Sequence, residues 1–301
     1  MRWFLDGLIF DRELTMSNVT ISSSAMLVDL TLKGYTGKKQ DRHVAEEVSL
    51  DKGAQARAGT YQKNLFAGCR QLASIQSYDV MVRQWHAART LPWSDRGPRL
   101  LPTKNYFQYL QELQQHKQVR EGLVTEFEQE YANIIQSAQF ELGALFDIDD
   151  YPDVSEIRHK FTFTYNLYPL PESGDFRVDI GNEGLEQLKQ EFEEAQNIRI
   201  TEAVQDIRNR VKEAVEKLSN QLRTEPDGKK GRVHESTLET CVELCDAIGG
   251  LNLTKDQEIE DLRRSLRNVV AGVDVKDLRK DTGAREMVKQ DLDDLLSKFA
   301  L

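Results

Sequence analysis

The sequence predicts a mainly α-helical fold of the α+β type, with long antiparallel, coiled-coil-like helices, a small antiparallel β-sheet and a small C-terminal helical unit. Apolar residues recur at steps of three and four along three long segments, which is the spacing of one face of an α-helix. Alternating apolar and polar residues indicate only a few short strands. Charged residues make up 30% of the chain and hydrophobic residues 39%, a balance that favours long, solvent-exposed helices.

The composition limits the classes of function. The 301 residues carry a formal charge of −10, which disfavours general binding to nucleic acid because phosphate neutralisation dominates such affinity. Cys69, Cys241 and Cys245 give no disulfide framework, so we expect a reducing, cytoplasmic environment. Cys241 and Cys245 share one helix face and are interpreted as buried apolar residues. No apolar run approaches the roughly 20 residues of a membrane span, and no cofactor or membrane partner is expected.

The first part of the chain contains a predicted strand and a short helix. Residues 1–15 precede a second methionine, Met16, and are interpreted either as an extension from an upstream start codon or as an amphipathic anchor that packs on the body. Alternation predicts a strand over 25–35, and a short charged helix is expected over 39–50. The sequence GYTGKK between them lacks the spacing of a phosphate-binding loop.

Three long helices follow. The first is expected to begin at Thr60, and the second to run from Thr103 to Phe146, with Thr103 as its cap and Gly122 as the place of a kink. A tight connection between two such helices favours an antiparallel helical hairpin. The third helix is expected over 182–222, with the apolar spacing of a coiled coil.

Two shorter features separate the second helix from the third. The aspartate-rich stretch 147–153 is interpreted as capping and turn rather than as a calcium loop, because it lacks the spacing of an EF-hand. Alternation over 160–168 and 175–180 predicts a β-hairpin. Two strands alone are marginal, so this hairpin needs the 25–35 strand or a helical face as a partner.

A polar, glycine-containing segment at 223–234 is predicted to be an exposed, mobile linker. After it, helices are expected at 235–248, 255–271 and 283–299, with a shorter turn near 274–280. The predicted organisation is an N-terminal extension (1–15), a long-helix body with the small sheet (16–222), a linker (223–234) and a C-terminal helical domain (235–301).

The loop between the first two helices, from Trp85 to Leu110, is the main candidate for function. Its three prolines stiffen it, and it concentrates basic and aromatic side chains in an acidic chain. It is either a packed connector whose arginines pair internally or a recognition loop on a rigid scaffold. Arginine captures carboxylate or phosphate, and aromatic rings stack on bases. The predicted binding residues are therefore Arg89, Trp93, Arg96, Arg99, Lys104 and Tyr106.

No catalytic or metal-binding motif is apparent, and the five histidines are scattered. The stretches SSSAMLVDLTLKGYTGKK, TLPWSDRGPRLLPTKNYFQY, LGALFDIDDYPDVSEIRHKFTF and PESGDFRVDI resemble an uncharacterised family of tailed-phage and prophage proteins over roughly residues 18–222. The resemblance implies a phage-encoded protein made in the cytoplasm of the bacterial host, and it supports Met16 as the usual first residue. It brings no activity and no catalytic residues.

The expected function is a non-enzymatic assembly or adaptor protein that self-associates through its helices and holds a phage or host protein with the basic loop. Long apolar stripes exceed what one hairpin and a small sheet cover, which predicts a homodimer or larger ring. The alternative is an accessory of phage DNA metabolism that binds single-stranded DNA through the same loop. An enzyme with a site built from distant residues is a third possibility.

Overall fold

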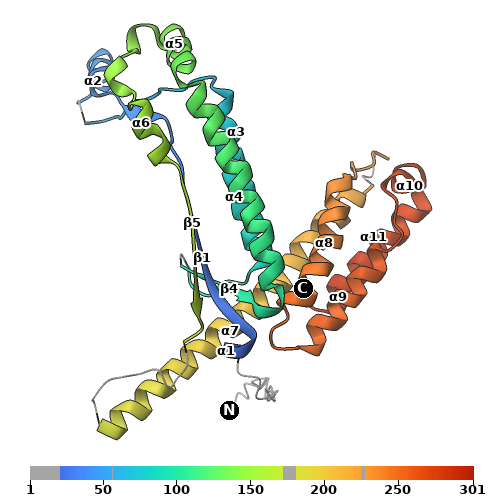
Figure 1. Ribbon diagram of the computed structural model, residues 1–301. Helices are drawn as coiled ribbons and strands as arrows, with labels where there is room; N and C mark the ends of the chain where they lie inside the picture. The colour runs from blue at the N-terminus through green and yellow to red at the C-terminus, as the bar shows by residue number, and fades with distance from the viewer. Residues whose placement is uncertain (1–20, 56, 96, 172–180, 225–227) are drawn as a thin grey trace, which may run out of the picture. The chain divides into compact units, whose positions relative to one another are not determined.

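The computed structural model describes residues 21–301 with the exception of 56, 96, 172–180 and 225–227 (Figure 1). The fold is mainly α with a small antiparallel sheet, which confirms the predicted fold class. The chain forms two compact units, and α7 (Gly181–Leu222) is divided between them after Glu194 and again after Ile207. We call them the hairpin unit (27–168 and 195–207) and the C-terminal unit, which contains 208–301.

The hairpin unit contains a three-stranded sheet in the order β4–β1–β5. β1 (Ala25–Lys33) and β5 (Thr162–Pro169) confirm the strands expected over 25–35 and 160–168, and β1 is the partner that the later strand required. The strand expected at 175–180 lies outside the described residues. β4 (Arg99–Pro102) falls in the proline-rich loop and was not expected. It lies at the edge of this sheet, where proline is tolerated because one side of the strand needs no backbone donors.

A two-stranded ribbon corrects the expected start of the first long helix. β2 (Lys38–Gln40) pairs antiparallel with β3 (Gln62–Asn64), so the helix expected from Thr60 begins only as α3 (Arg70–Arg89). Gly68 has a left-handed backbone (φ 73°), which a continuous helix does not allow. Between the two strands, α2 (Arg42–Asp51) confirms the short charged helix.

α3 and α4 (Tyr106–Gln129) form the predicted antiparallel hairpin and lie side by side (Figure 1). Contacts near the loop join the end of α3 to the beginning of α4: His86 Nδ1 lies 2.8 Å from Tyr109 Oη. Further from the loop, Asp79 of α3 pairs with Arg120 of α4: Arg120 Nε lies 2.5 Å from Asp79 Oδ1. Because residue numbers fall along one helix as they rise along the other, the two helices run in opposite directions.

The second helix of the hairpin differs from its prediction in two details. A 3₁₀ turn, η1 (Thr103–Asn105), precedes α4, and the Thr103 side chain caps neither element. The helix is interrupted at Glu130 (φ −88°, ψ 0°), after which α5 (Tyr131–Leu142) follows. Gly122, the expected kink, lies within α4. A glycine inside a helix costs only about 1 kcal/mol relative to alanine, so it does not by itself break the helix.

The aspartate-rich stretch forms the turns expected of it. Asp147 accepts a hydrogen bond from the backbone of Asp149 at 3.0 Å and so caps η3 (Ile148–Asp150). Asp150 has a different role, because its buried carboxylate pairs with Lys39 and Lys63. The short elements of the chain are α1 (Ile21–Ser24), η2 (Gly143–Leu145), α6 (Val154–Ile157) and η4 (Arg158–Lys160). An apolar core beside this region contains Leu65, Phe66, Leu72, Ile75, Val124, Phe127, Tyr131, Ile134, Ala138, Tyr151, Ile157 and Phe161.

The C-terminal unit combines the end of α7 with the four predicted helical segments. These are α8 (Glu235–Leu251), α9 (Gln257–Val270), α10 (Val275–Lys280) and α11 (Thr282–Lys298). α7 itself confirms the helix expected over 182–222. Cys241 and Cys245 are buried in α8, as expected of small apolar residues, and burial raises the pKa of both thiols to about 11.

The segment 223–234 lies inside the C-terminal unit, so the compact units divide the chain at a different place from the expected boundary. Arg285 of α11 donates hydrogen bonds to the carbonyl oxygens of Gln221 at 2.6 Å and Gly231 at 2.7 Å. These bonds satisfy one carbonyl near the end of α7 and one within the segment, and so attach both to α11. Val233 is fully buried, so the segment is not exposed throughout as expected.

Candidate interaction surfaces of the helical hairpin

The loop between α3 and α4 is held in place by its own backbone. Leu91 and Leu100 form an antiparallel bridge, in which each backbone N–H donates to the other carbonyl at 2.9 Å. Both leucines are buried. Arg99 donates from Nε to Thr90 Oγ1 at 2.8 Å and from Nη2 to the Thr90 carbonyl at 3.2 Å. The predicted binding residue Arg99 therefore closes the loop on itself.

Arg89 is engaged inside the hairpin. Its Nε donates to Glu112 Oε2 at 2.5 Å, and its guanidinium lies 5.6 Å from the centre of the Trp85 ring. Trp85 donates to the same carboxylate oxygen at 2.7 Å. Burial alone would raise the pKa of Glu112, but hydrogen bonds from Arg89 and Trp85 outweigh it and lower the pKa below its ordinary value. Arg89 therefore has an internal carboxylate partner.

Trp93 is buried rather than available for stacking. Trp93 is only 6% exposed, and the guanidinium of Arg199 lies 5.1 Å from the centre of its ring. Bases stack on aromatic rings that present a free face, which Trp93 does not offer. Arg96 lies outside the described residues. For Arg89, Trp93 and Arg99, the contacts favour the packed-connector alternative for this loop.

Lys104 and Tyr106, at the start of α4, are the remaining described members of the predicted set. Lys104 is exposed and Tyr106 half-buried, with its ring edge-on to that of Phe107 at 5.1 Å between centres. Phe107 is 84% exposed and was not singled out from the sequence. Its sequence signal is its position, because it falls outside the stripe formed by the buried residues Tyr109 and Leu113.

A second surface that sequence reasoning missed lies along α3. The outward side of this helix carries exposed, uncharged side chains, which we call the α3 outer face: Ala73, Ser74, Ser77, Val80, Met81 and Gln84. The two charged residues of this stretch point elsewhere, because Asp79 pairs with Arg120 and Arg83 donates to the Leu32 carbonyl at 3.0 Å. The sequence signal is the lack of charged residues at these helical positions, which becomes informative once the buried face of α3 is known.

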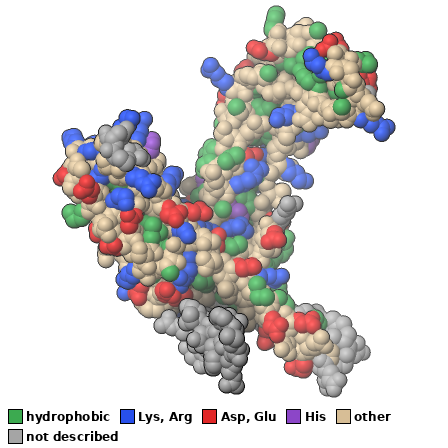
Figure 2. Space-filling model, turned by 180° about the vertical axis from the view of Figure 1, so that it is seen from behind, with side chains coloured by type: hydrophobic (Ala, Val, Ile, Leu, Met, Phe, Trp, Pro, Cys, Tyr) green, Lys and Arg blue, Asp and Glu red, His purple; other side chains and the backbone are tan. Residues whose placement is uncertain are grey.

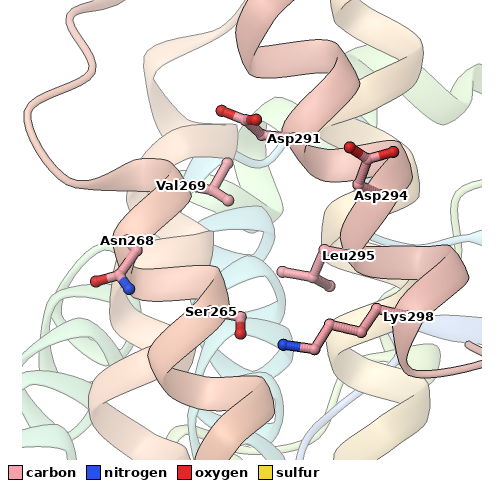
Figure 3. Close-up of a pocket in the computed structure, with 7 residues that line it drawn as sticks. All are labelled: Ser265, Asn268, Val269, Asp291, Asp294, Leu295 and Lys298. Atoms are coloured by element: carbon pink, nitrogen blue, oxygen red, sulfur yellow. The ribbon is translucent and has the colours of Figure 1, made fainter.

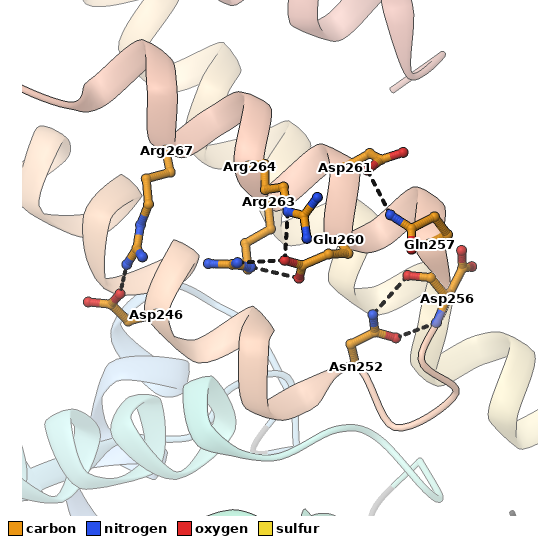
Figure 4. A network of polar contacts seen from close by, with 9 residues as sticks. All are labelled: Asp246, Asn252, Asp256, Gln257, Glu260, Asp261, Arg263, Arg264 and Arg267. Atoms are coloured by element: carbon orange, nitrogen blue, oxygen red, sulfur yellow. Dashed lines mark hydrogen bonds and ion pairs between the residues drawn. The ribbon is translucent and has the colours of Figure 1, made fainter.

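The surface of the C-terminal unit is different in character. Figure 2 shows Lys and Arg side chains intermixed with Asp and Glu over this unit, at the left of that view. On α9, Arg263 donates to both carboxylate oxygens of Glu260 at 2.8 and 2.6 Å, and this contact lowers the pKa of Glu260 to about 2 (Figure 4). Arg267 pairs with Asp246 of α8. This basic stretch is therefore neutralised and forms no net positive surface.

A shallow hollow of about 340 Å³ lies between α9 and α11 (Figure 3). Its lining is mixed, and Asp294 is held by Gln290 at 2.8 Å, while the Lys298 ammonium lies 5.0 Å from the centre of the Phe299 ring. The lining residues are Ser265, Asn268, Val269, Asp291, Asp294, Leu295 and Lys298. Among the described residues, no group of three or more His, Cys, Asp or Glu side chains is placed to hold a metal ion.

Comparison with known proteins gives no relative: no protein-family model, no curated protein and no solved structure matches the chain. In the described part of the chain, no helix has both the length and the apolar character required to cross a lipid bilayer. The residues and their contacts are therefore the basis for assigning a function.

Proposed function

We propose that this is a phage-encoded, non-enzymatic assembly or adaptor protein of the bacterial host cytoplasm, and that two copies associate through the α3 outer face. The observation that carries the proposal is that the six exposed side chains of the α3 outer face are uncharged, in a chain with a net charge of −10. Acidic surfaces repel when two copies approach. The α3 outer face allows two copies to meet without opposing like charges.

The dimensions and residues of α3 suit a helix-to-helix contact. Its 20 residues span roughly 30 Å at about 1.5 Å per residue. Ala73, Ser74 and Ser77 have small side chains that let two helix backbones approach closely, and Val80 and Met81 supply apolar area. A two-fold axis would place the face against itself, which is the usual symmetry of a homodimer. Two hairpins joined in this way form a four-helix arrangement.

In this proposal the basic loop acts chiefly as the connector that fixes the hairpin. The accessible surface at the start of α4, formed by Lys104, Tyr106 and Phe107, is the point of contact for a phage or host protein. Binding of single-stranded DNA remains the alternative function. It would depend on Lys104 and Tyr106 without stacking on Trp93, which is buried.

The test introduces charge on the α3 outer face. The double variant Ser77→Glu with Gln84→Glu places two carboxylates, seven positions apart, on the face of each copy. The matched control, Gln111→Glu with Gln118→Glu, makes the same change of charge at exposed positions of α4. We expect analytical ultracentrifugation to show association of the parent and the control, and association weaker by about tenfold or more in the α3 variant.

Three results would contradict the proposal: a parent protein that is monomeric throughout the micromolar range, an α3 variant that associates like the parent, or equal loss in both variants. Circular dichroism of each variant checks that the helices are intact. A parallel titration with labelled single-stranded DNA tests the alternative, because binding that weakens steeply with salt would favour a nucleic-acid function.

A further inference from the structure

The stretch GYTGKK, which does not have the spacing of a phosphate-binding loop, lines a hollow at the beginning of α3. This hollow has a volume of about 490 Å³. Three segments that are separate in the sequence form it: the start of β2 with the loop before it, the end of β3 with the turn after it, and the first part of α3. Its lining residues are Thr36, Lys38, Asn64, Phe66, Gly68, Cys69, Arg70, Leu72, Ala73 and Gln76.

The lining is positively charged in an otherwise acidic chain. Lys38 and Arg70 contribute to it from two different segments, and no acidic residue is among the lining residues. Within the described chain, neither side chain has a carboxylate partner, whereas the neighbouring Lys39 and Lys63 both pair with Asp150. Two unneutralised cations around one concave surface create a local positive potential that attracts anions.

Neutral hydrogen-bond donors accompany the two cations. Asn64 accepts a hydrogen bond from the Phe66 backbone through Oδ1 at 3.3 Å, which leaves its amide NH₂ group to donate. Thr36 Oγ1 accepts from the Lys38 backbone at 3.4 Å, which leaves its hydroxyl proton to donate. The buried Phe66 and Leu72 form an apolar wall beside these groups. Charged contacts, neutral donors and an apolar wall are the usual components of a small-molecule site.

We propose that this hollow binds the phosphate group of a small phosphorylated ligand. Arg70 offers the planar guanidinium that can contact two phosphate oxygens, and Lys38 supplies a point charge. Thr36 and Asn64 donate to the remaining oxygens. A phosphate group carries about −1.5 to −2 charge at neutral pH, which the two cations balance. The volume of about 490 Å³ exceeds that of a phosphate alone and leaves room for an apolar or planar group against Phe66 and Leu72.

Cys69 provides a reporter within the hollow. It is half-buried and lines the hollow, whereas Cys241 and Cys245 are buried in α8. The full-length protein is treated with the uncharged reagent iodoacetamide, and the rate of Cys69 modification is followed by peptide mass spectrometry. Tripolyphosphate and inorganic phosphate are the probes, with sodium chloride added to keep the ionic strength constant.

We expect tripolyphosphate to slow Cys69 modification about threefold or more, with saturation, because the bound anion covers the thiol. The variant Lys38→Gln with Arg70→Gln loses this protection. The matched control, Lys52→Gln with Arg57→Gln, removes two positive charges outside the hollow and keeps the protection. If the double variant does not fold, the single changes Lys38→Gln and Arg70→Gln are measured separately, and each weakens the protection.

Two outcomes overturn the proposal. One is a rate that does not change with tripolyphosphate or inorganic phosphate in the parent. The other is protection that does not depend on the two cations of the hollow. Protection would then be equal in the parent and the Lys38/Arg70 variant, or the control variant would lose as much protection as that variant. Either result means general screening by charge rather than a site. Isothermal titration of the parent with tripolyphosphate gives an independent measure of binding.

Discussion

At the scale of single residues, buried charges decide how the segments of each unit are joined. Arg120 contacts both oxygens of Asp79, at 2.5 and 3.1 Å, and its Nη2 also donates to the Lys33 carbonyl at 2.7 Å. One guanidinium therefore connects α3, α4 and the end of β1. Arg285 is satisfied differently, because backbone carbonyls rather than a carboxylate surround it among the described residues. A buried charge requires such partners, since its desolvation is otherwise unfavourable.

Replacing Arg285 tests whether carbonyl capture holds the C-terminal unit together. Arg285→Met keeps an apolar side chain of similar length but leaves the carbonyls of Gln221, Leu222 and Gly231 without this donor. Each buried acceptor that loses its partner costs roughly 1–3 kcal/mol, so we expect a total loss of about 3 kcal/mol or more in the free energy of unfolding. Urea unfolding followed by far-UV circular dichroism measures it.

The control for this prediction is Arg264→Met on α9. Arg264 is exposed and pairs with Glu260 four positions away, at 3.1 Å. Exposed pairs of this type contribute about 0.3–0.5 kcal/mol, so the transition should move little. Equal shifts in the two variants would show that the buried position of Arg285 confers no special stability.

At the scale of elements, the spacing of apolar residues predicted the helices well, because the buried face of a helix repeats with the same period of about 3.6 residues as the helix itself. α7 and the helices of the C-terminal unit lie close to where the apolar spacing placed them. The start of α3 was predicted wrongly because Leu65 also fits a helical stripe. Its backbone N–H instead donates to the Gly37 carbonyl at 2.7 Å, beside the β2–β3 pairing. That pairing joins residues far apart in sequence, so local spacing does not contain it.

The hairpin has a built-in dependence on pH through His86. Burial, with a smaller effect from the charge of Arg99, lowers the pKa of His86 to about 4. In the unfolded chain the pKa of histidine is about 6.5, so the unfolded state binds a proton more readily. The contribution of His86 to the free energy of unfolding is therefore complete above roughly pH 6.5, declines as the pH falls toward about 4, and levels off below that pH. The pKa difference corresponds to a loss of about 3 kcal/mol.

The change His86→Gln tests this dependence. Glutamine takes up no proton, and its amide can replace the hydrogen bond between His86 Nδ1 and Tyr109 Oη, which measures 2.8 Å. The free energy of unfolding is compared at neutral pH and near pH 4.5 in both proteins. We expect the parent to lose more stability on acidification than the variant. Identical losses in the parent and the variant would assign the pH dependence to other groups.

At the scale of the whole molecule, composition located the basic loop, but the partners of its residues were beyond prediction. Arg89 pairs with Glu112 across the hairpin, and Trp93 packs against Arg199, more than a hundred positions later. No local sequence pattern predicts such contacts, because they form only when helices that are distant in the sequence pack together. The α3 outer face could be identified from the sequence in principle. Its signal is the absence of charge at exposed helical positions, which becomes meaningful only once the buried face is known.

The division of the chain leads to a prediction about which part folds alone. The end of α7 contributes the buried residues Val211, Val215 and Leu218 to the C-terminal unit. Ser219 Oγ donates to Asp293 of α11 at 2.6 Å, and Gln221 Nε2 donates to Thr237 of α8 at 2.9 Å. A fragment that begins after the 223–234 segment lacks Val211, Val215, Leu218, Ser219 and Gln221. It would expose the apolar surface that α7 covers, which favours aggregation.

We therefore expect the fragment 208–301 to be helical and monomeric, and to unfold in one cooperative transition on heating. The fragment 235–301 should unfold at a lower temperature without a sharp transition, because part of its core is missing. Circular dichroism melts of the two purified fragments measure the difference. If 235–301 melts as cooperatively and at the same temperature as 208–301, the boundary lies at the 223–234 segment, where composition placed it. If only the longer fragment is cooperative, α7 is shared between the two units, and the end of that helix is an integral part of the C-terminal one.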